Sequence, residues 1–154
     1  MPAETTTERL LAQREILIDA RPETVWEFLV DPEKLLRWKG VHTTFEARVG
    51  AGYRTEVVPG NVAVGEVLEL DPPRRLVYSW GWEGDPDVPP GSTVVEYELL
   101  PEGDRTRVRL THRDLPSRES LERHAHGWEH YLGRLAVVAA GGDPGPDSFL
   151  TERS

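Results

Sequence analysis

The sequence of 154 residues contains no cysteine, which excludes disulfide bonds and metal sites built on thiolates. It also lacks an apolar run long enough to cross a membrane, and residues 1–14 lack the apolar region of a signal peptide. These absences predict a cytoplasmic protein, and the lack of cysteine is compatible with a reducing compartment.

Basic charge is scarce as well. The formal net charge is -9, which argues against a nucleic-acid-binding protein, because contacts to phosphates need a basic face. Lysine is the rarest basic residue, with only Lys34 and Lys39. A bias toward arginine is typical of a GC-rich genome, so we interpret it as a sign of ancestry and not of mechanism.

The length predicts one domain that can bury a core without disulfides or metals. No internal repeat or interdomain linker is visible. We predict a flexible leader over residues 1–11, a folded domain over 12–141, and a flexible tail over 142–154, which is rich in Gly, Pro and Asp.

The segment from Ile16 to Trp38 predicts the end of a strand followed by two short helices. Pro22 suits the first position of a helix, and Asp31 before Pro32 can cap the next one. Helices this short need a sheet to pack on. Their apolar side chains predict this packing: Val25, Trp26, Phe28, Leu29, Leu35 and Trp38.

Short segments rich in Val, Tyr, Thr and Trp, separated by turn residues, predict an antiparallel meander. After a first strand over Gln13–Asp19, the predicted strands are His42–Arg48, Tyr53–Val58, Asn61–Leu70, Arg75–Trp82, Ser92–Leu100 and Thr106–Arg113.

The apolar spacing then changes to that of a helix, from Ser117 to Ala140, which ends at Gly141-Gly142. A long helix after such a sheet must lie across it. We therefore predict an α+β fold, with a curved antiparallel sheet of six or seven strands around one long C-terminal helix and two short helices closing one end.

Alternation along the strands predicts which polar residues face the interior. Glu66 falls in the phase of Val62 and Leu68, His112 in the phase of Leu110, and His124 lies between apolar positions of the long helix. A sheet wrapped around one helix leaves space between them, so these three side chains are expected to line a cavity.

Two interpretations of these polar residues remain open. A carboxylate and two imidazoles could transfer protons, with His112 or Glu66 as the general acid or base. Alternatively, each could simply be a satisfied polar group in a binding cavity, which we favour. The expected cavity residues are Trp38, Glu66, Tyr78, Trp80, Tyr97, Leu110, His112, His124 and Trp128.

Other chemical patterns are weak. His126 and His130 are four residues apart, with Glu122 one turn earlier, a spacing that can hold a metal, but a solvated helix face explains it better. No Gly-x-Ser-x-Gly elbow is present to support nucleophilic hydrolysis. We expect no metal and no cofactor.

Several ordered motifs resemble the family of homologues of the activator of heat-shock-protein-90 ATPase, within the START-like, or SRPBCC, superfamily. The motifs are Ala20–Trp26, Asp31-Pro32 through Trp38, Gly65-Glu66-Val67, Asp71-Pro72-Pro73, Arg75-Leu76-Val77 with Trp80, Ser92-Thr93-Val94, Thr106 through His112, and His124-x-x-Gly127-Trp128. The resemblance implies a helix-grip fold with a deep hydrophobic cavity.

Since one fold hosts many functions, the resemblance leaves several open. We expect first a non-catalytic binder of a hydrophobic small molecule, such as a lipid or polyketide-like metabolite. The alternatives are a cyclase or dehydratase that uses His112 or Glu66, a cochaperone-like protein-interaction domain, and a natural-product resistance protein. Neither nucleic acid nor membrane insertion is expected.

Overall fold

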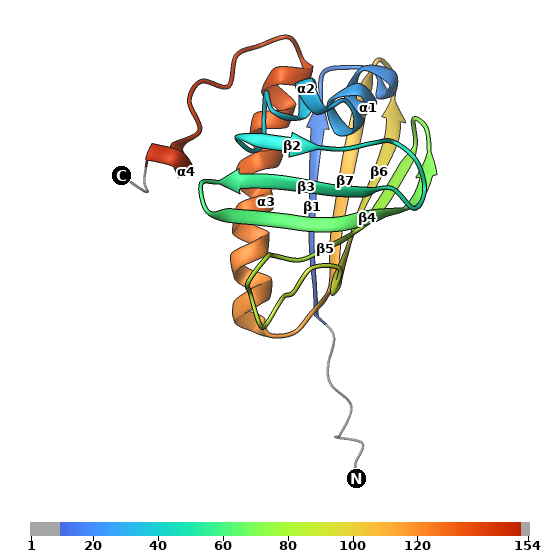
Figure 1. Cartoon of the computed structure of the whole chain (residues 1–154). Coiled ribbons are helices and arrows are strands. Elements are labelled where there is room, and N and C mark those ends of the chain that lie inside the picture. Colours follow the sequence, from blue (N-terminus) through green and yellow to red (C-terminus); the bar gives the residue numbers. More distant parts are fainter. Residues whose placement is uncertain (1–9, 152–154) are drawn as a thin grey trace.

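A computed structural model describes residues 10–151 of the chain (Figure 1). Residues 1–9 of the predicted leader and 152–154 of the predicted tail lie outside the described residues. The elements, in chain order, are β1 (Leu10–Ile18), α1 (Pro22–Val30), α2 (Pro32–Leu35), β2 (His42–Thr44), β3 (Gly52–Val58), β4 (Asn61–Asp71), β5 (Arg75–Trp80), β6 (Thr93–Glu102), β7 (Arg105–Leu115), α3 (Arg118–Ala139) and α4 (Ser148–Thr151).

The strands form one antiparallel sheet in the order β1-β7-β6-β5-β4-β3-β2. The sheet is strongly curved: β2, β3 and β4 run across the direction of β1, β7 and β6, and α3 lies against the concave side (Figure 1). The predicted α+β helix-grip architecture is therefore confirmed.

The two short helices begin as the sequence predicts. Pro22 starts α1, and the side chain of Asp31 accepts a hydrogen bond from the backbone N–H of Glu33 at the start of α2, at 3.0 Å. Val25 and Leu29 of α1 and Leu35 of α2 are buried against the core. The two helices thus close one end of the space between sheet and helix.

The long helix α3 is capped by Ser117, whose hydroxyl accepts from the backbone N–H of Ser120 at 3.1 Å. Its buried face packs Trp128, Leu132 and Leu135 into the core that the inner side chains of the sheet also fill. Burial of this apolar face, rather than helix propensity, accounts for most of the stability of α3.

The predicted boundaries differ from the structure at both ends. Strand β1 begins at Leu10, within the predicted leader. Residues 142–151 of the predicted tail fold back onto α3, end in α4 and bury Asp147. Gly and Pro, which led to the prediction of a tail, also build turns that a side chain can anchor.

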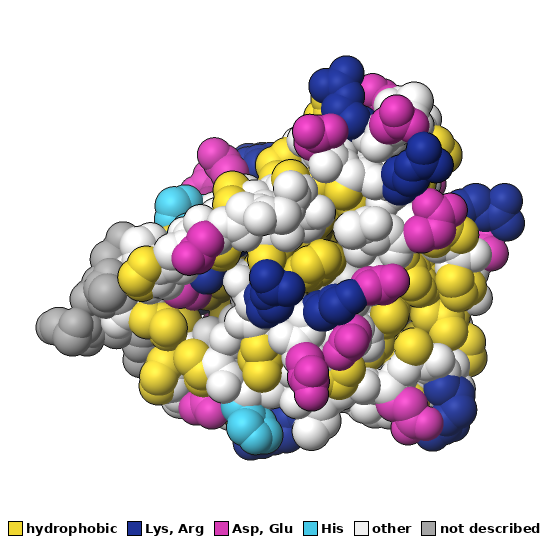
Figure 2. All heavy atoms as spheres, turned by 90° about the horizontal axis from the view of Figure 1, so that it is seen from above, with side chains coloured by type: hydrophobic (Ala, Val, Ile, Leu, Met, Phe, Trp, Pro, Cys, Tyr) yellow, Lys and Arg dark blue, Asp and Glu magenta, His cyan; other side chains and the backbone are white. Residues whose placement is uncertain are grey.

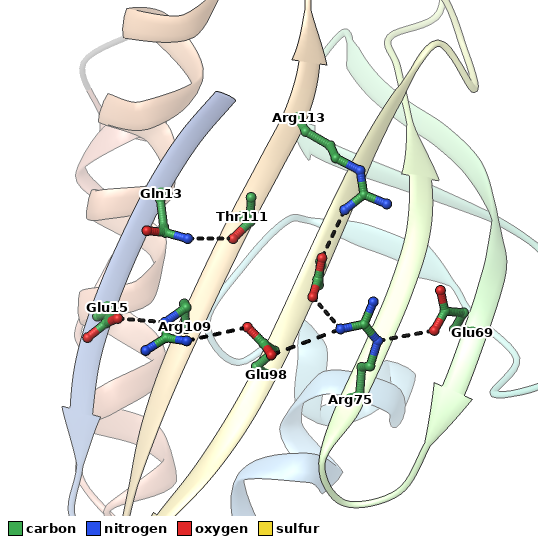
Figure 3. A network of polar contacts seen from close by, with 9 residues as sticks. Gln13, Glu15, Glu69, Arg75, Glu98, Arg109, Thr111 and Arg113 are labelled. Atoms are coloured by element: carbon green, nitrogen blue, oxygen red, sulfur yellow. Dashed lines mark hydrogen bonds and ion pairs between the residues drawn. The ribbon is translucent and has the colours of Figure 1, made fainter. Parts of the chain in front are cut away.

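The outer face of the sheet carries a network of paired charges, which we call the charge ladder (Figure 3). Arg109 of β7 contacts Glu15 of β1 at 2.6 Å and Glu98 of β6 at 3.7 Å. Arg75 of β5 reaches Glu98, Glu96 and Glu69 on the strands beside it, and Arg113 donates to Glu96 at 2.8 Å. The charge alternates in sign from strand to strand, so side chains that are neighbours on adjacent strands attract each other.

At the end of the molecule seen in Figure 2, basic and acidic side chains are interspersed, with hydrophobic side chains between them. No patch of a single sign is visible on this face. The net charge of -9 is therefore not gathered there into one field that would steer a highly charged partner.

Candidate functional site

A cavity of about 500 Å³ opens between the concave side of the sheet and α3. Its wall is mainly aromatic and aliphatic, with a few polar groups, as is typical of small-molecule sites. The lining residues come from the turn after α2, from β3–β5 and the loop after β5, and from α3 and α4: Lys39, Val57, Val58, Asn61, Trp80, Trp82, Glu83, Gly84, Asp85, Arg123, His124, Gly127, Trp128, Tyr131 and Phe149.

Lys39 is the unusual member of this wall. It lies in the turn that ends α2, where its backbone N–H donates to the carbonyl of Leu35 at 3.0 Å. Gly40 follows with φ +95°, and a Cβ there would lie 3.1 Å from the carbonyl oxygen of Glu56. Glycine thus allows the chain to turn sharply immediately after Lys39 and to pass close to the backbone of β3.

The side chain of Lys39 is almost completely enclosed, with 5 % of its surface exposed. Its Nζ lies 4.8 Å from the ring centroid of Trp128, 5.1 Å from that of Trp38 and 5.3 Å from that of Trp80. Within residues 10–151 no carboxylate forms an ion pair with it. Burial without a counter-ion lowers the pKa of Lys39 to about 7.

Trp128, one wall of the cavity, is held in place by His112. Its indole N–H donates to Nδ1 of His112 at 3.0 Å. The other ring nitrogen, Nε2, lies 2.8 Å from the hydroxyl of Thr93, which itself donates to the carbonyl of Trp80. Nε2 must therefore be the protonated nitrogen, so His112 is neutral and both of its nitrogens are used.

Trp82 is held in the same manner by His124. Its indole N–H donates to Nε2 of His124 at 2.9 Å, and Nδ1 of that ring donates to the carbonyl of Ser120 at 2.8 Å. Burial lowers the pKa of His124, and it lowers the pKa of His112 further, with the nearby His124 and Lys39 adding to the effect. Both histidines act as neutral supports for the tryptophans of the wall.

The indole of Trp80 is different. Its ring lines the cavity, yet its Nε1–H is buried and has no hydrogen-bond acceptor within the described part of the chain. A buried donor left unpaired costs about 1–3 kcal/mol. The site thus contains an unsatisfied donor beside an unpaired ammonium group.

The remaining charges around the cavity are compensated by partners. Glu83 accepts two hydrogen bonds from Arg54, at 3.0 and 3.1 Å, which lower the pKa of its carboxyl group. Asp85 lies 3.9 Å from Arg123. Lys39 is consequently the one charged group of the described lining that has no partner of opposite charge.

The folded-back C-terminal segment, residues 142–151, forms the last part of the wall through Phe149. Asp147 anchors this segment: it accepts from Tyr131 at 2.8 Å, from the backbone N–H of Phe149 at 2.9 Å, and contacts Nε2 of His130 at 2.7 Å. The ring of Phe149 stacks on His130 with centroids 3.7 Å apart. The helix face that we expected to be solvated therefore binds this segment.

Replacement of Asp147 by asparagine is expected to loosen the segment, because an amide nitrogen cannot accept the hydrogen bond of Tyr131. We expect faster amide exchange over residues 143–150 and a loss of about 1–2 kcal/mol in the free energy of unfolding. Hydrogen exchange with mass spectrometry measures the first effect. Asp143→Asn, at an exposed position of the same segment, is the control, and equal exchange in both variants would contradict the anchoring role.

The structure brings together three of the expected cavity residues, since Trp80, His124 and Trp128 all line the cavity. Tyr78 borders a second, much smaller space of about 10 Å³, which Lys39 also lines. The other aromatic and aliphatic candidates, Trp38, Tyr97 and Leu110, are fully buried core residues, as is His112. They support the wall from behind.

The predicted inward orientation of Glu66 is wrong, because its side chain is exposed on the outer face. Ala63 and Val67 occupy the interior instead, while Leu68 is 40 % exposed. A β-bulge between Val67 and Glu69 changes the phase within β4, so that a single alternation could not fit the whole strand. Glu66 does not converge with the two histidines.

Within residues 10–151, His, Asp and Glu side chains form no cluster of three or more that could hold a metal ion. His126, one of the two histidines at metal-ligand spacing, stacks on Phe149. In the same range, no helix has the length and hydropathy needed to span a membrane.

The sequence matches the model of a known protein family over residues 19–140, described as Activator of Hsp90 ATPase homolog 1-like protein. The chain belongs to this family. The AHSA1-like assignment covers every element from α1 to α3, so the cavity described above lies within the shared domain, except for the part formed by Phe149.

Solved structures agree with this assignment. An AHSA1-like protein from Rhizobium etli is 46 % identical, with 92 % of this chain and 89 % of that chain covered and a TM-score of 0.75. CalU16 from Micromonospora echinospora is 32 % identical, with coverage of 88 % and 87 % and a TM-score of 0.69. No curated protein sequence matches the chain significantly.

A third similar structure is DynU16, described as a protein in the dynemicin biosynthetic locus. It is 26 % identical, with a TM-score of 0.75, and the match covers 87 % of this chain and 48 % of that chain. The AHSA1-like domain thus corresponds to about half of DynU16.

Proposed function

We propose that this AHSA1-like protein binds a hydrophobic small molecule in the cavity between its sheet and α3. The observation that carries the proposal is the cavity itself, whose volume of about 500 Å³ falls in the range of known ligand sites. The wall supports it further, since Trp80, Trp82 and Trp128 offer flat apolar surfaces to a ring system. The occurrence of DynU16 in a biosynthetic locus fits a metabolite as the ligand.

Binding without chemistry is the function that the polar groups support best. Both nitrogens of His112 are occupied by Trp128 and Thr93, and those of His124 by Trp82 and Ser120. Neither ring has a nitrogen free to exchange a proton with a ligand. The histidines hold the wall rigid, which lowers the entropic cost of binding.

A glycine on α3 allows the cavity to be filled without disturbing the backbone. Gly127 lines the cavity, and a Cβ at this position would meet no atom within 4 Å. We expect Gly127→Leu to fold normally and to weaken the binding of N-phenyl-1-naphthylamine, a neutral apolar fluorescent probe, by about tenfold or more, since a side chain takes the ligand's place. Fluorescence titration measures the affinity.

Gly133→Leu is the matched control, because Gly133 lies on the same helix, also has open space around a Cβ, and does not line the cavity. Both substitutions remove a helix glycine, which favours the helix by roughly 0.5–1 kcal/mol in each case. Equal affinity of the probe for both variants and for the unmodified protein would contradict the proposed cavity site.

A further inference from the structure

On the basis of that function, we propose that the cavity selects hydrophobic molecules that carry one acidic group, a carboxylate, sulfonate or ionised phenol, and that this group pairs with the ammonium group of Lys39. The arrangement of charges and donors around Lys39 carries this inference. The aromatic wall accounts for affinity toward the apolar part of a ligand, whereas Lys39 accounts for the polar group that the ligand carries.

The first step is that the ammonium group has no counter-ion of its own. Three indole rings surround Nζ at 4.8–5.3 Å, and cation–π contacts of this kind contribute about 0.5–2 kcal/mol each. Burial of an unpaired charge costs several kcal/mol, which such contacts only partly offset. An acidic ligand would supply the missing partner inside the cavity.

The second step is that the other charged groups near the cavity do not act as the counter-ion of Lys39. Glu83 is bound by Arg54, and Asp85 by Arg123. The other titratable groups that face Lys39 or line either space beside it are uncharged at neutral pH: His112, His124, Tyr53, Tyr78 and Tyr131. A protonated Lys39 therefore gives the interior an uncompensated positive charge.

The third step is independent of Lys39. Trp80 contributes a buried Nε1–H that has no acceptor among the described residues, on the same ring that contacts Nζ at 5.3 Å. Both groups lack the same thing, a hydrogen-bond acceptor. An oxygen anion bound beside this ring would supply an acceptor to the ammonium group through a charge-assisted hydrogen bond.

Two probes with the same rings separate charge from hydrophobicity. 1-Anilinonaphthalene-8-sulfonate and N-phenyl-1-naphthylamine differ by the sulfonate group alone. At pH 6.5, we expect Lys39→Met to lower the affinity for the sulfonate probe by about tenfold. The affinity for the neutral probe should change by less than about twofold. In the unmodified protein, affinity for the sulfonate should fall between pH 6 and pH 9, as Lys39 loses its proton.

Lys34→Met is the control, since Lys34 is the chain's other lysine and pairs with Glu27 on the surface. With only two lysines, the ¹³Cε signals of labelled protein also give a direct reading, and the sulfonate probe should raise the pKa of Lys39.

The outcomes separate this inference from the proposed function. In one outcome, Lys39→Met lowers the affinity for neither probe, or lowers both affinities equally, while Gly127→Leu still blocks binding. The acidic-group preference is then wrong and the cavity function stands. If neither probe binds the unmodified protein, or if Gly127→Leu leaves both affinities unchanged, the cavity function fails and this inference fails with it.

Discussion

Replacement of Lys39 by methionine is expected to stabilise the protein at pH 7 by about 2–4 kcal/mol. The buried ammonium has a pKa of about 7, whereas an unfolded chain keeps lysine protonated up to pH ~10.4. Folding at pH 7 therefore forces the group partly out of its preferred charged state. Methionine fills a similar volume and carries no charge, so it removes this cost.

The pH dependence gives this prediction a specific sign. Between pH 7 and pH 10 the unfolded chain holds a proton on Lys39 that the folded chain has released, so the free energy of unfolding rises with pH. The difference in the free energy of unfolding between Lys39→Met and the unmodified protein should accordingly fall to about 1 kcal/mol near pH 9.5. Urea unfolding of both proteins at pH 7 and 9.5 measures the change, and Lys34→Met should stay within about 0.5 kcal/mol of the unmodified protein. A difference that does not vary with pH would contradict the buried, unpaired state of Lys39.

Acidification from pH 6 to pH 5 is expected to lower the free energy of unfolding by about 1 kcal/mol or more, through His112 and His124 together. Their pKa values are lowered in the folded protein, so below pH ~6.5 the unfolded chain takes up protons that the folded chain excludes. A histidine that stays neutral in the folded protein contributes up to about 1.4 kcal/mol per pH unit, and stability falls as pH falls. Lys39 adds nothing in this window, because it is protonated in both states well below its pKa of about 7.

His124→Gln tests the assignment to individual residues. The glutamine oxygen can still accept from Trp82, but the side chain does not titrate. We expect the slope of stability between pH 6 and pH 5 to become smaller in urea titrations. His42→Gln, at an exposed position, is the control for the substitution itself. An unchanged slope in His124→Gln would show that the acid sensitivity arises elsewhere.

The general fold was predictable from the sequence because it follows from strong local signals. Asp31-Pro32 marks the start of α2, Ser117 caps α3, and the turn residues separate the strands close to their observed bounds. These signals act over a few residues, so no distant contact is needed to interpret them.

The site was less predictable, because it depends on contacts that no local pattern encodes. The bulge in β4 reverses the phase that was expected to turn Glu66 inward. Lys39 follows a tryptophan in a turn, where lysine is normally exposed, yet the fold buries it in the cavity wall. The one available signal was rarity: Lys39 is one of two lysines in a chain whose surface uses arginine.

The charge ladder on the outer face of the sheet also bears on how copies of the protein meet (Figure 3). An open sheet offers a broad surface on which a second sheet could stack. Here a second copy would first have to strip water from Glu15, Arg109, Glu98, Arg75 and their neighbours, all of which already have partners of opposite charge within the chain. The ladder therefore adds a dehydration cost to any self-association through this face, and this cost does not depend on net charge.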